Sequence, residues 1–196
     1  MNRKIFGVLL VALPLFMSSC GYNSLVHKDE ACVAQWAQVE NVYQRRSDLI
    51  PNIVATVKGE ANFEQETLTK VIEARASATQ VKIDPSNMTE ADLKRFDEAQ
   101  NTLGGTLSRL LMVTENYPTL QANQAFRDLR VELEGSENRI SVERKKFIES
   151  VQDYNTFRRK FPYNITAGIF GFDKRPTFEA REGSDQVPVV DFESDK

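Results

Sequence analysis

The sequence predicts an all-α protein: an antiparallel up-and-down four-helix bundle with a long fourth helix and an irregular C-terminal tail. In four separate stretches, apolar residues recur at steps of three and four, which is the spacing of a helix with one buried face. The 196 residues include only 9 glycines and 7 prolines, and most prolines lie outside these stretches. A composition of 41% hydrophobic and 27% charged residues is ordinary for a globular domain with one core.

The N-terminal residues have the pattern of an export signal. Arg3 and Lys4 precede an apolar run at residues 5–17, which is too short to span the ~30 Å core of a bilayer comfortably. Two serines and Cys20 follow. Small residues before a cysteine, after such a run, are typical of a bacterial lipoprotein signal, which is cut before the cysteine. We therefore predict acylation of Cys20, for example with palmitate. An uncleaved anchor and a signal cut without lipidation are the alternatives.

This interpretation divides the chain into four parts. They are a signal peptide at residues 1–19, a lipidated tether at 20–28, the bundle at 29–160, and an irregular, partly disordered tail at 161–196. The mature protein would be a lipoprotein of the cell membrane with its domain in the periplasm, on either the inner or the outer membrane. The net charge of −3 becomes about −5 without the signal, so we expect no nucleic-acid partner.

The first helix is predicted to begin near Asp29 or Glu30 and to end at Lys58, with Gly59 as its stop. Its buried seam consists of Cys32, Trp36, Val39, Tyr43, Ile50, Ile53 and Val57. Since Cys32 lies on this seam, we interpret it as a small buried apolar residue and not as a reactive thiol.

Two residues of the first helix do not suit a plain helical seam. Arg46 occupies the seam position between Tyr43 and Ile50, so its charge must be paired or must reach past the seam to water. Pro51 has no amide hydrogen and crowds the carbonyl of Ser47, one turn back. We therefore predict a kink or a break at Pro51.

The second and fourth helices are predicted from their caps and their apolar faces. The second begins at an N-cap residue, Asn62, and reaches about Gln80; its apolar face is Leu68, Val71, Ile72 and Ala78. The fourth begins at Pro118, since proline suits the first helical position, and continues to about Lys160. Its apolar face is Phe126, Leu129, Leu133, Ile140, Phe147, Val151 and Tyr154.

The third helix has the most regular pattern. It follows a loop at residues 84–87 and a capping pair, Thr89 and Asp92. Its apolar face is Leu93, Phe96, Leu103, Leu107 and Leu110, and Gln100 also falls on it. Gly104 and Gly105 lie in the middle of this helix and each costs roughly 1 kcal/mol relative to alanine. We interpret them as room for the close approach of a neighbouring helix; a flexible joint is the alternative.

Two blocks of the sequence are the most specific ones: Gln44-Arg45-Arg46-Ser47-Asp48-Leu49-Ile50-Pro51-Asn52 and Leu133-Glu134-Gly135-Ser136-Glu137-Asn138-Arg139-Ile140. Shorter pieces accompany them at residues 22–26, 36, 57–59, 74–75, 115–118, 154–155, 161–162 and 190–192. In these blocks and pieces the chain resembles the LemA family of bacterial membrane-associated proteins. The resemblance implies an antiparallel four-helix bundle without an established enzymatic activity. Many family members have an N-terminal transmembrane helix and a domain inside the cell, so the lipoprotein signal is a departure.

The charged residues of the two specific blocks and one residue of the second helix form the only candidate site. It consists of Arg45, Arg46, Asp48, Arg75, Glu134, Glu137, Asn138 and Arg139. The first interpretation is a buried ion-pair network that fixes the register of the helices, and the alternative is a partner-binding site. Counting equal steps from the Gly59 turn predicts that Asp48 pairs with Arg75. Similar counting gives Glu134 and Glu137 as the best partners of Arg46, with Glu73 behind them.

The sequence lacks the residues that common catalytic and metal sites require. His27 is its single histidine, whereas a di-metal site in a bundle needs a histidine on each of two helices. No metalloprotease, phosphate-loop, dinucleotide or serine-hydrolase motif occurs. We therefore predict no enzyme, no cofactor, and no catalytic or metal-binding residues.

Two functions remain from the sequence. The first is a membrane-tethered interaction or scaffold protein of the bacterial cell envelope, with an envelope protein as its partner, for which a membrane protease is one candidate. The alternative is a carrier that opens its bundle at Pro51 and at the Gly104-Gly105 pair to hold a lipid or another apolar ligand.

The stretch after the fourth helix is apolar and is bracketed by basic residues. It contains Phe161, Tyr163, Ile165, Ile169, Phe170 and Phe172, with Lys160, Lys174 and Arg175 as its flanks. In an antiparallel bundle it lies at the same end as the lipidated N-terminus, so Phe170 and Phe172 are candidates for a second membrane contact. The alternative is that these side chains cap the end of the bundle.

Overall fold

The computed structural model describes the backbone of residues 3–60 and 63–178, and the side chains of residues 21–60 and 63–178. This part of the chain is helical and contains no strand, which confirms the predicted all-α class. The helices are α1 (Arg3–Lys58), α2 (Gln65–Gln80), α3 (Glu90–Thr114), α4 (Pro118–Ala122), α5 (Gln124–Arg159) and α6 (Tyr163–Phe170).

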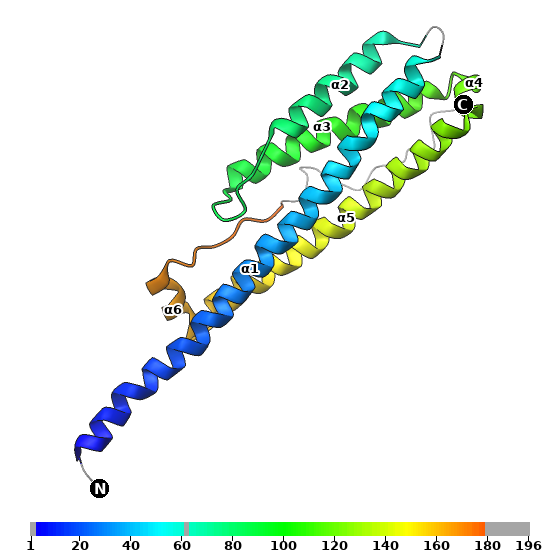
Figure 1. Cartoon of the computed structure of the whole chain (residues 1–196). Helices are drawn as coiled ribbons and strands as arrows, with labels where there is room; N and C mark the ends of the chain where they lie inside the picture. Colours follow the sequence, from blue (N-terminus) through cyan, green and yellow to red (C-terminus); the bar gives the residue numbers. More distant parts are fainter. Residues whose placement is uncertain (1–2, 61–62, 179–196) are drawn as a thin grey trace, which may run out of the picture.

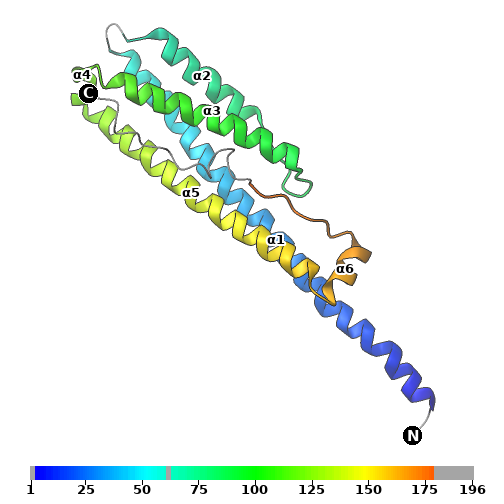
Figure 2. The same ribbon diagram turned by 180° about the vertical axis from the view of Figure 1, so that it is seen from behind.

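The long helices are arranged as two pairs of unequal length. α1 packs along α5, while α2 packs mainly against α3 and lies over the C-terminal half of α1 (Figure 1). Three contacts fix the antiparallel register of α1 and α5: Lys28–Asp153 at 2.5 Å, Gln35–Glu143 at 2.8 Å and Arg45–Glu132 at 3.1 Å. The N-terminal part of α1 extends beyond all other helices (Figure 2).

Helix α1 differs from its prediction in two places, its N-terminal start and the region of Pro51. It begins at Arg3, so residues 21–28, predicted as a polar tether, are helical. Leu25 explains this, because it is fully buried in the core that α1 forms with α5 and α6. The helix also continues through Pro51 without a break, with Ile50 and Ile53 buried on either side. Cys32 is buried as predicted, and burial raises the pKa of its thiol, which favours the less nucleophilic neutral form.

The caps of α2 and α3 show one wrong and one correct prediction. α3 begins with the predicted capping box, in which Thr89 and Asp92 bond to each other's backbone amides. The N-cap of α2 is Glu64, without a side-chain cap, and Asn62 lies outside the described residues. Ile72, predicted on the apolar face of α2, is 52% exposed, and the apolar residues of α2 that pack in the core are Leu68, Val71, Ala74 and Ala78.

The predicted fourth helix is two helices. Pro118 begins a helix as expected, but α4 ends after one turn. Asn123 then takes an extended conformation, and its side chain accepts a hydrogen bond from the amide of Phe126 at the start of α5. The capping ability of asparagine therefore restarts the helix at a new angle.

The core has two clusters that meet at a polar layer. The first contains Trp36, Tyr43, Phe96, Ile140 and Phe147, and the second contains Ile50, Leu103, Leu107, Phe126 and Leu133. Between them lie four buried polar residues from three helices: Arg46, Ser47, Gln100 and Ser136. Helices α1, α3 and α5 therefore each change from one apolar cluster to the other at this layer, whereas α2 contributes to the second cluster alone.

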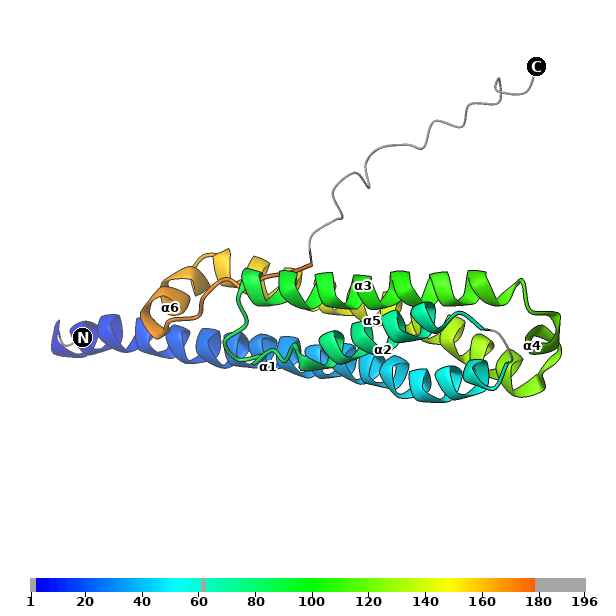
Figure 3. The same cartoon turned by 90° about the horizontal axis from the view of Figure 1, so that it is seen from above.

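The first part of the C-terminal tail, predicted as irregular, contains a helix. The apolar stretch forms α6, which ends at Gly171 with a φ of 71°. A strap at residues 172–178 follows and runs back over α1 and α5 toward α3 (Figure 3). Tyr163 of α6 stacks on Phe157 of α5 with ring centroids 4.1 Å apart. Residues 179–196 lie outside the described part.

Candidate functional site

Arg46 lies at the centre of the polar layer and connects three helices. Its side chain is 3% exposed, and Nη1 donates to Glu137 Oε1 of α5 at 2.7 Å. Nη2 donates to the side-chain oxygen of Gln100 of α3 at 2.6 Å and to its carbonyl at 3.2 Å. The guanidinium also lies over the ring of Tyr43, 5.1 Å from the centroid. The predicted partner Glu137 is therefore present, and Gln100 adds two acceptors that the sequence counting did not anticipate.

The glycine pair of α3 lies beside this arginine. A Cβ atom on Gly104 would lie 3.6 Å from Arg46 Nη1, whereas one on Gly105 would meet nothing within 4 Å. The close approach predicted here is made by the guanidinium of Arg46 and not by a helix backbone. Nothing in the described part of the chain occupies the space beside Gly105.

Arg75 does not pair with Asp48, and Pro51 explains its true position. Nε of Arg75 donates to the carbonyl of Ser47 at 2.9 Å. In a regular helix the amide four residues on would donate to that carbonyl, but Pro51 has no amide hydrogen. Arg75 therefore replaces the donor that the proline removes. Asp48 is on the exposed side of α1, where it accepts a hydrogen bond from Gln44 at 2.8 Å.

The remaining predicted residues of the charged block lie at the surface. Arg45 pairs with Glu132 at 3.1 Å, with both side chains about half exposed. Glu134 pairs with Arg130 of its own helix at 2.9 Å and not with Arg46. Asn138 and Arg139 are exposed. Cys20 is outside the described side chains.

A second arginine, Arg144, is partly buried in the same region and was not predicted from the sequence. Its Nη1 donates to the hydroxyl of Tyr43 at 3.0 Å and forms an ion pair with Asp97 of α3. Burial alone would lower the pKa of Arg144, but the nearby Tyr43 and Asp97 outweigh burial and raise it. Burial likewise raises the pKa of Tyr43. Arg144 occupies the seam position between Ile140 and Phe147, as Arg46 does between Tyr43 and Ile50, so the same signal was available.

A third arginine, Arg175, fastens the strap. Its Nε and Nη2 donate to the two carboxylate oxygens of Asp29 at 2.5 and 2.9 Å, and its Nη1 donates to the carbonyl of Pro85 at 2.6 Å. Asn155 exchanges two hydrogen bonds with the backbone of Arg175, at 2.9 and 3.0 Å. The hydrogen bond with Asp29 raises the pKa of Arg175. Burial, together with the charge of Asp29, raises the pKa of Tyr154 to about 12.

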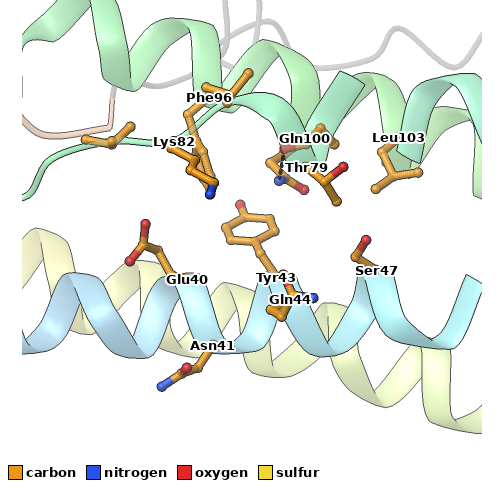
Figure 4. Close-up of a pocket in the computed structure, with 13 residues that line it drawn as sticks. Glu40, Asn41, Tyr43, Gln44, Ser47, Thr79, Lys82, Phe96, Gln100 and Leu103 are labelled. Carbon is orange, nitrogen blue, oxygen red and sulfur yellow. Dashed lines mark hydrogen bonds between the residues drawn. The ribbon is translucent and has the colours of Figure 1, made fainter. Parts of the chain in front are cut away.

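Open cavities lie on both sides of the polar layer. One of about 400 Å³ separates α1 from the α2–α3 hairpin. Figure 4 shows Tyr43 of α1 pointing across it toward Phe96 and Gln100 of α3; the rings of Tyr43 and Phe96 are 5.0 Å apart. Two more, of about 540 and 470 Å³, lie between α3 and α5 and share Arg46, Gln100, Asn101 and Glu137.

The described part of the chain offers little for metal chemistry or for crossing a membrane. It contains no group of three or more histidine, cysteine, aspartate or glutamate side chains that could hold a metal ion. Within the same residues, no helix has both the length and the apolar character needed to cross a membrane.

The fold and the site define an all-helical protein in which a buried arginine, Arg46, contacts side chains of two neighbouring helices. The sequence model of the LemA family matches residues 35–192, which is more than half of the chain. The chain therefore belongs to the LemA family. The matched residues include the strap, Arg46 and Arg144.

Magnetosome proteins are among the relatives of this chain. Magnetosome proteins MamQ 1 and MamQ 2 of Paramagnetospirillum magneticum (strain ATCC 700264 / AMB-1) are each 25% identical over 203 residues, which cover 95% of this chain and 74% of the relative. Magnetosome protein MamQ of Magnetospirillum gryphiswaldense (strain DSM 6361 / JCM 21280 / NBRC 15271 / MSR-1) is 25% identical over 207 residues, covering 96% and 76%. The similarity thus extends over nearly all of this chain.

Proposed function

We propose that this protein is a non-enzymatic scaffold of the bacterial cell envelope, held at the membrane by lipidated Cys20 and by α6, with its bundle in the periplasm. Membership of the LemA family supports an envelope role. The observation that carries the proposal is the position of an exposed apolar helix directly beside the residue that would bear the lipid.

Helix α6 packs on the first turns of α1 after Cys20. A Cβ atom on Gly21 would lie 3.0 Å from the ring of Tyr163, which is the first residue of α6. Tyr22 contacts Phe170 and Phe172, with ring centroids 4.9 and 5.6 Å apart. A lipid on Cys20 would therefore bring α6 to the membrane surface.

The outer face of α6 suits that surface. On α6, Ile169 is 72% exposed, Phe170 58% and Ile165 54%, and Phe161, which directly precedes the helix, is 80% exposed. Exposed Lys160 and Lys174 lie on either side of the helix. Apolar side chains flanked by basic ones favour the headgroup region of an anionic bilayer. Phe172 is half-buried and packs on the core, so the membrane contact consists of the other four residues and does not include Phe172.

Two measurements test this proposal. Metabolic labelling with an alkyne fatty acid should mark the wild-type chain and leave the Cys20→Ala chain unmarked. A chain that begins at residue 21 should float with vesicles of phosphatidylglycerol and phosphatidylcholine, and the Ile169→Ser/Phe170→Ser variant should bind them at least tenfold more weakly. Met112→Ser is the matched control, because Met112 is 67% exposed but lies near the opposite end of the bundle.

Equal labelling of both chains would contradict the lipid anchor. Equal flotation of the α6 variant and the wild type would contradict the contact by α6. A large loss of thermal stability in the α6 variant, without a loss of binding, would assign these side chains to packing alone.

The scaffold role needs a protein partner in the envelope. We propose that its charged groups serve structure and not catalysis, because Arg46, Arg75, Arg144 and Arg175 are each used in contacts between elements. Cross-linking in intact cells, followed by identification of the captured proteins, should reproducibly yield one envelope protein with the wild-type chain. A membrane protease is one candidate for this partner. The Cys20→Ala chain should not capture it. A small apolar molecule retained in native mass spectrometry would favour the carrier function instead.

A further inference from the structure

A groove runs along the molecule between α3 and α5. These two helices make few direct contacts, and each packs on another partner. The two cavities between them share Arg46 and Glu137, so they form one continuous groove. It extends from Arg144 at one end to Leu111 and Leu133 at the other.

The α3 side of the groove is shaped for the close approach of a chain. Gly104, Gly105 and Ser108 line it, and a Cβ atom on Gly105 would meet nothing within 4 Å. Each of these glycines costs roughly 1 kcal/mol of helix stability relative to alanine. Arg46 accounts for Gly104, but no contact among the described residues accounts for Gly105. Leu107, Leu111 and Leu133 give this end of the groove an apolar lining.

The strap leads directly into this groove. Its hydrogen bonds with Asn155 are followed by contacts of Phe178 with Phe147 and Arg144, so the strap follows α5 toward the N-terminus of that helix. The ring of Phe178 lies 3.8 Å from the guanidinium of Arg144, which lines the near end of the groove. The last described residue in this region is therefore seated at the entrance.

The chain that follows has the length and composition to fill the groove. Arg144 and Leu133 are about 16 Å apart along α5 at 1.5 Å per residue, and residues 179–196 reach roughly 60 Å when extended. After a charged segment comes Val187-Pro188-Val189-Val190-Asp191-Phe192, the one apolar run beyond Phe178. The family match ends at residue 192 and therefore includes this run.

We propose that residues 187–192 dock in the groove between α3 and α5, where Val190 and Phe192 cover Leu111 and Leu133 beside the glycines of α3. The chain thereby binds its own C-terminal segment as a further layer on the bundle. Apolar burial provides the affinity, and the strap holds the segment close to its site, which raises its effective concentration. The polar backbone of an extended segment stays in the open part of the groove.

Thiol labelling of the full chain in its native membrane tests this docking. In Ser108→Cys, the new thiol lines the groove at a position that the described residues leave exposed. Its rate of reaction with a maleimide should be at least tenfold lower than in the same chain carrying Val190→Asp and Phe192→Asp. Thr102→Cys is the matched control, because Thr102 is an exposed residue of α3 that does not line the groove; its rate should be equal with both tails. Labelling is quantified on the peptide that contains the new cysteine.

The possible results separate the tail from other occupants. If the maleimide reacts with residue 108 at the same rate in chains with the wild-type tail and with the Val190→Asp/Phe192→Asp tail, the proposal is overturned. This holds whether both rates are fast or both are slow. If the protection of residue 108 from the maleimide decreases on dilution, a second copy of the chain occupies the groove. This result would also overturn the proposal. A disulfide between Ser108→Cys and Val190→Cys, formed within one chain under mild oxidation, would support it directly. Unchanged melting of the tail variant excludes unfolding as the cause of faster labelling.

Discussion

Arg46 and Arg175 both join separate parts of the molecule, but they do so in different surroundings. Arg46 is 3% exposed, lies between three helices, and has a single anionic partner. Arg175 is 13% exposed, fastens the strap to α1, and donates hydrogen bonds to both carboxylate oxygens of Asp29. Water can replace the partners of Arg175 when the strap leaves, whereas the partners of Arg46 lie on α3 and α5 and move away from it only when these helices separate. The first site should therefore control global stability, and the second should control a local opening.

The largest effect is expected from Arg46→Ala. It leaves the buried Gln100 without its partner and empties part of the core, so it should cost about 3 kcal/mol, while Glu137 is 49% exposed and becomes solvated. Urea unfolding measures this cost. Arg46→Met fills most of the volume without a charge and should lose clearly less. A denaturation midpoint of Arg46→Ala equal to that of the wild type would show that the polar layer does not stabilise the fold.

Arg175→Ala should have a smaller and local effect. It removes charge-assisted hydrogen bonds that contribute about 2 kcal/mol. Hydrogen exchange should become faster at residues 171–178 and in the part of α1 around Asp29, and should stay unchanged in α2. Asp29→Asn is the companion variant and should act in the same direction. Equal acceleration in α2 would mean that the strap belongs to the global unfolding unit, and the contrast between the two arginines would fail.

The next effect concerns Arg75, which donates a hydrogen bond to the Ser47 carbonyl in place of the amide that Pro51 lacks. Arg75→Ala leaves the Ser47 carbonyl without a donor and should cost about 1–2 kcal/mol. Pro51→Ala restores an amide at the position that normally donates to this carbonyl. In the Pro51→Ala background, Arg75→Ala should therefore cost less than about 0.5 kcal/mol. A double-mutant cycle in urea measures the difference, and additive losses would show that Arg75 does not act through this carbonyl.

The smallest effect is expected from Asp48→Ala. Asp48 is exposed and bonds only to Gln44 on its own helix, and such surface contacts contribute about 0.5 kcal/mol or less. The unfolding midpoint should therefore match that of the wild type within error. A loss of 2 kcal/mol or more would revive the pairing of Asp48 with Arg75 that the helix counting predicted.

The apolar periodicity was enough to predict the helices and most of the core. Cys32, Trp36, Val39, Tyr43 and Ile50 are all buried as the spacing requires. Periodicity also identified Arg46, because a charge at a seam position needs a partner, and counting from the helix ends came within reach of Glu137. The same counting gave the wrong partner for Arg75, since it compared side chains only and left out the backbone carbonyl that Pro51 exposes.

Periodicity was less informative about where helices end and what lies beyond them. Asn123 interrupts the fourth helical stretch by a local cap, which does not disturb the spacing of the apolar residues around it. The strap has no period at all, because Arg175 and Phe178 are held by single contacts with distant residues. Such contacts depend on the completed bundle and are not encoded in any local pattern.

The continuity of α1 has a mechanical consequence. Its 56 residues form one rod of about 84 Å at 1.5 Å per residue. Arg75 braces this rod at the proline where it would otherwise be weakest. For the part from residue 20 to Lys58, about 58 Å long, a tilt of about 5° at the near end displaces the far end by about 5 Å. A contact that fixes the angle of the first turns of α1 relative to the membrane therefore also fixes the distance of the Gly59 turn from the membrane and its lateral position.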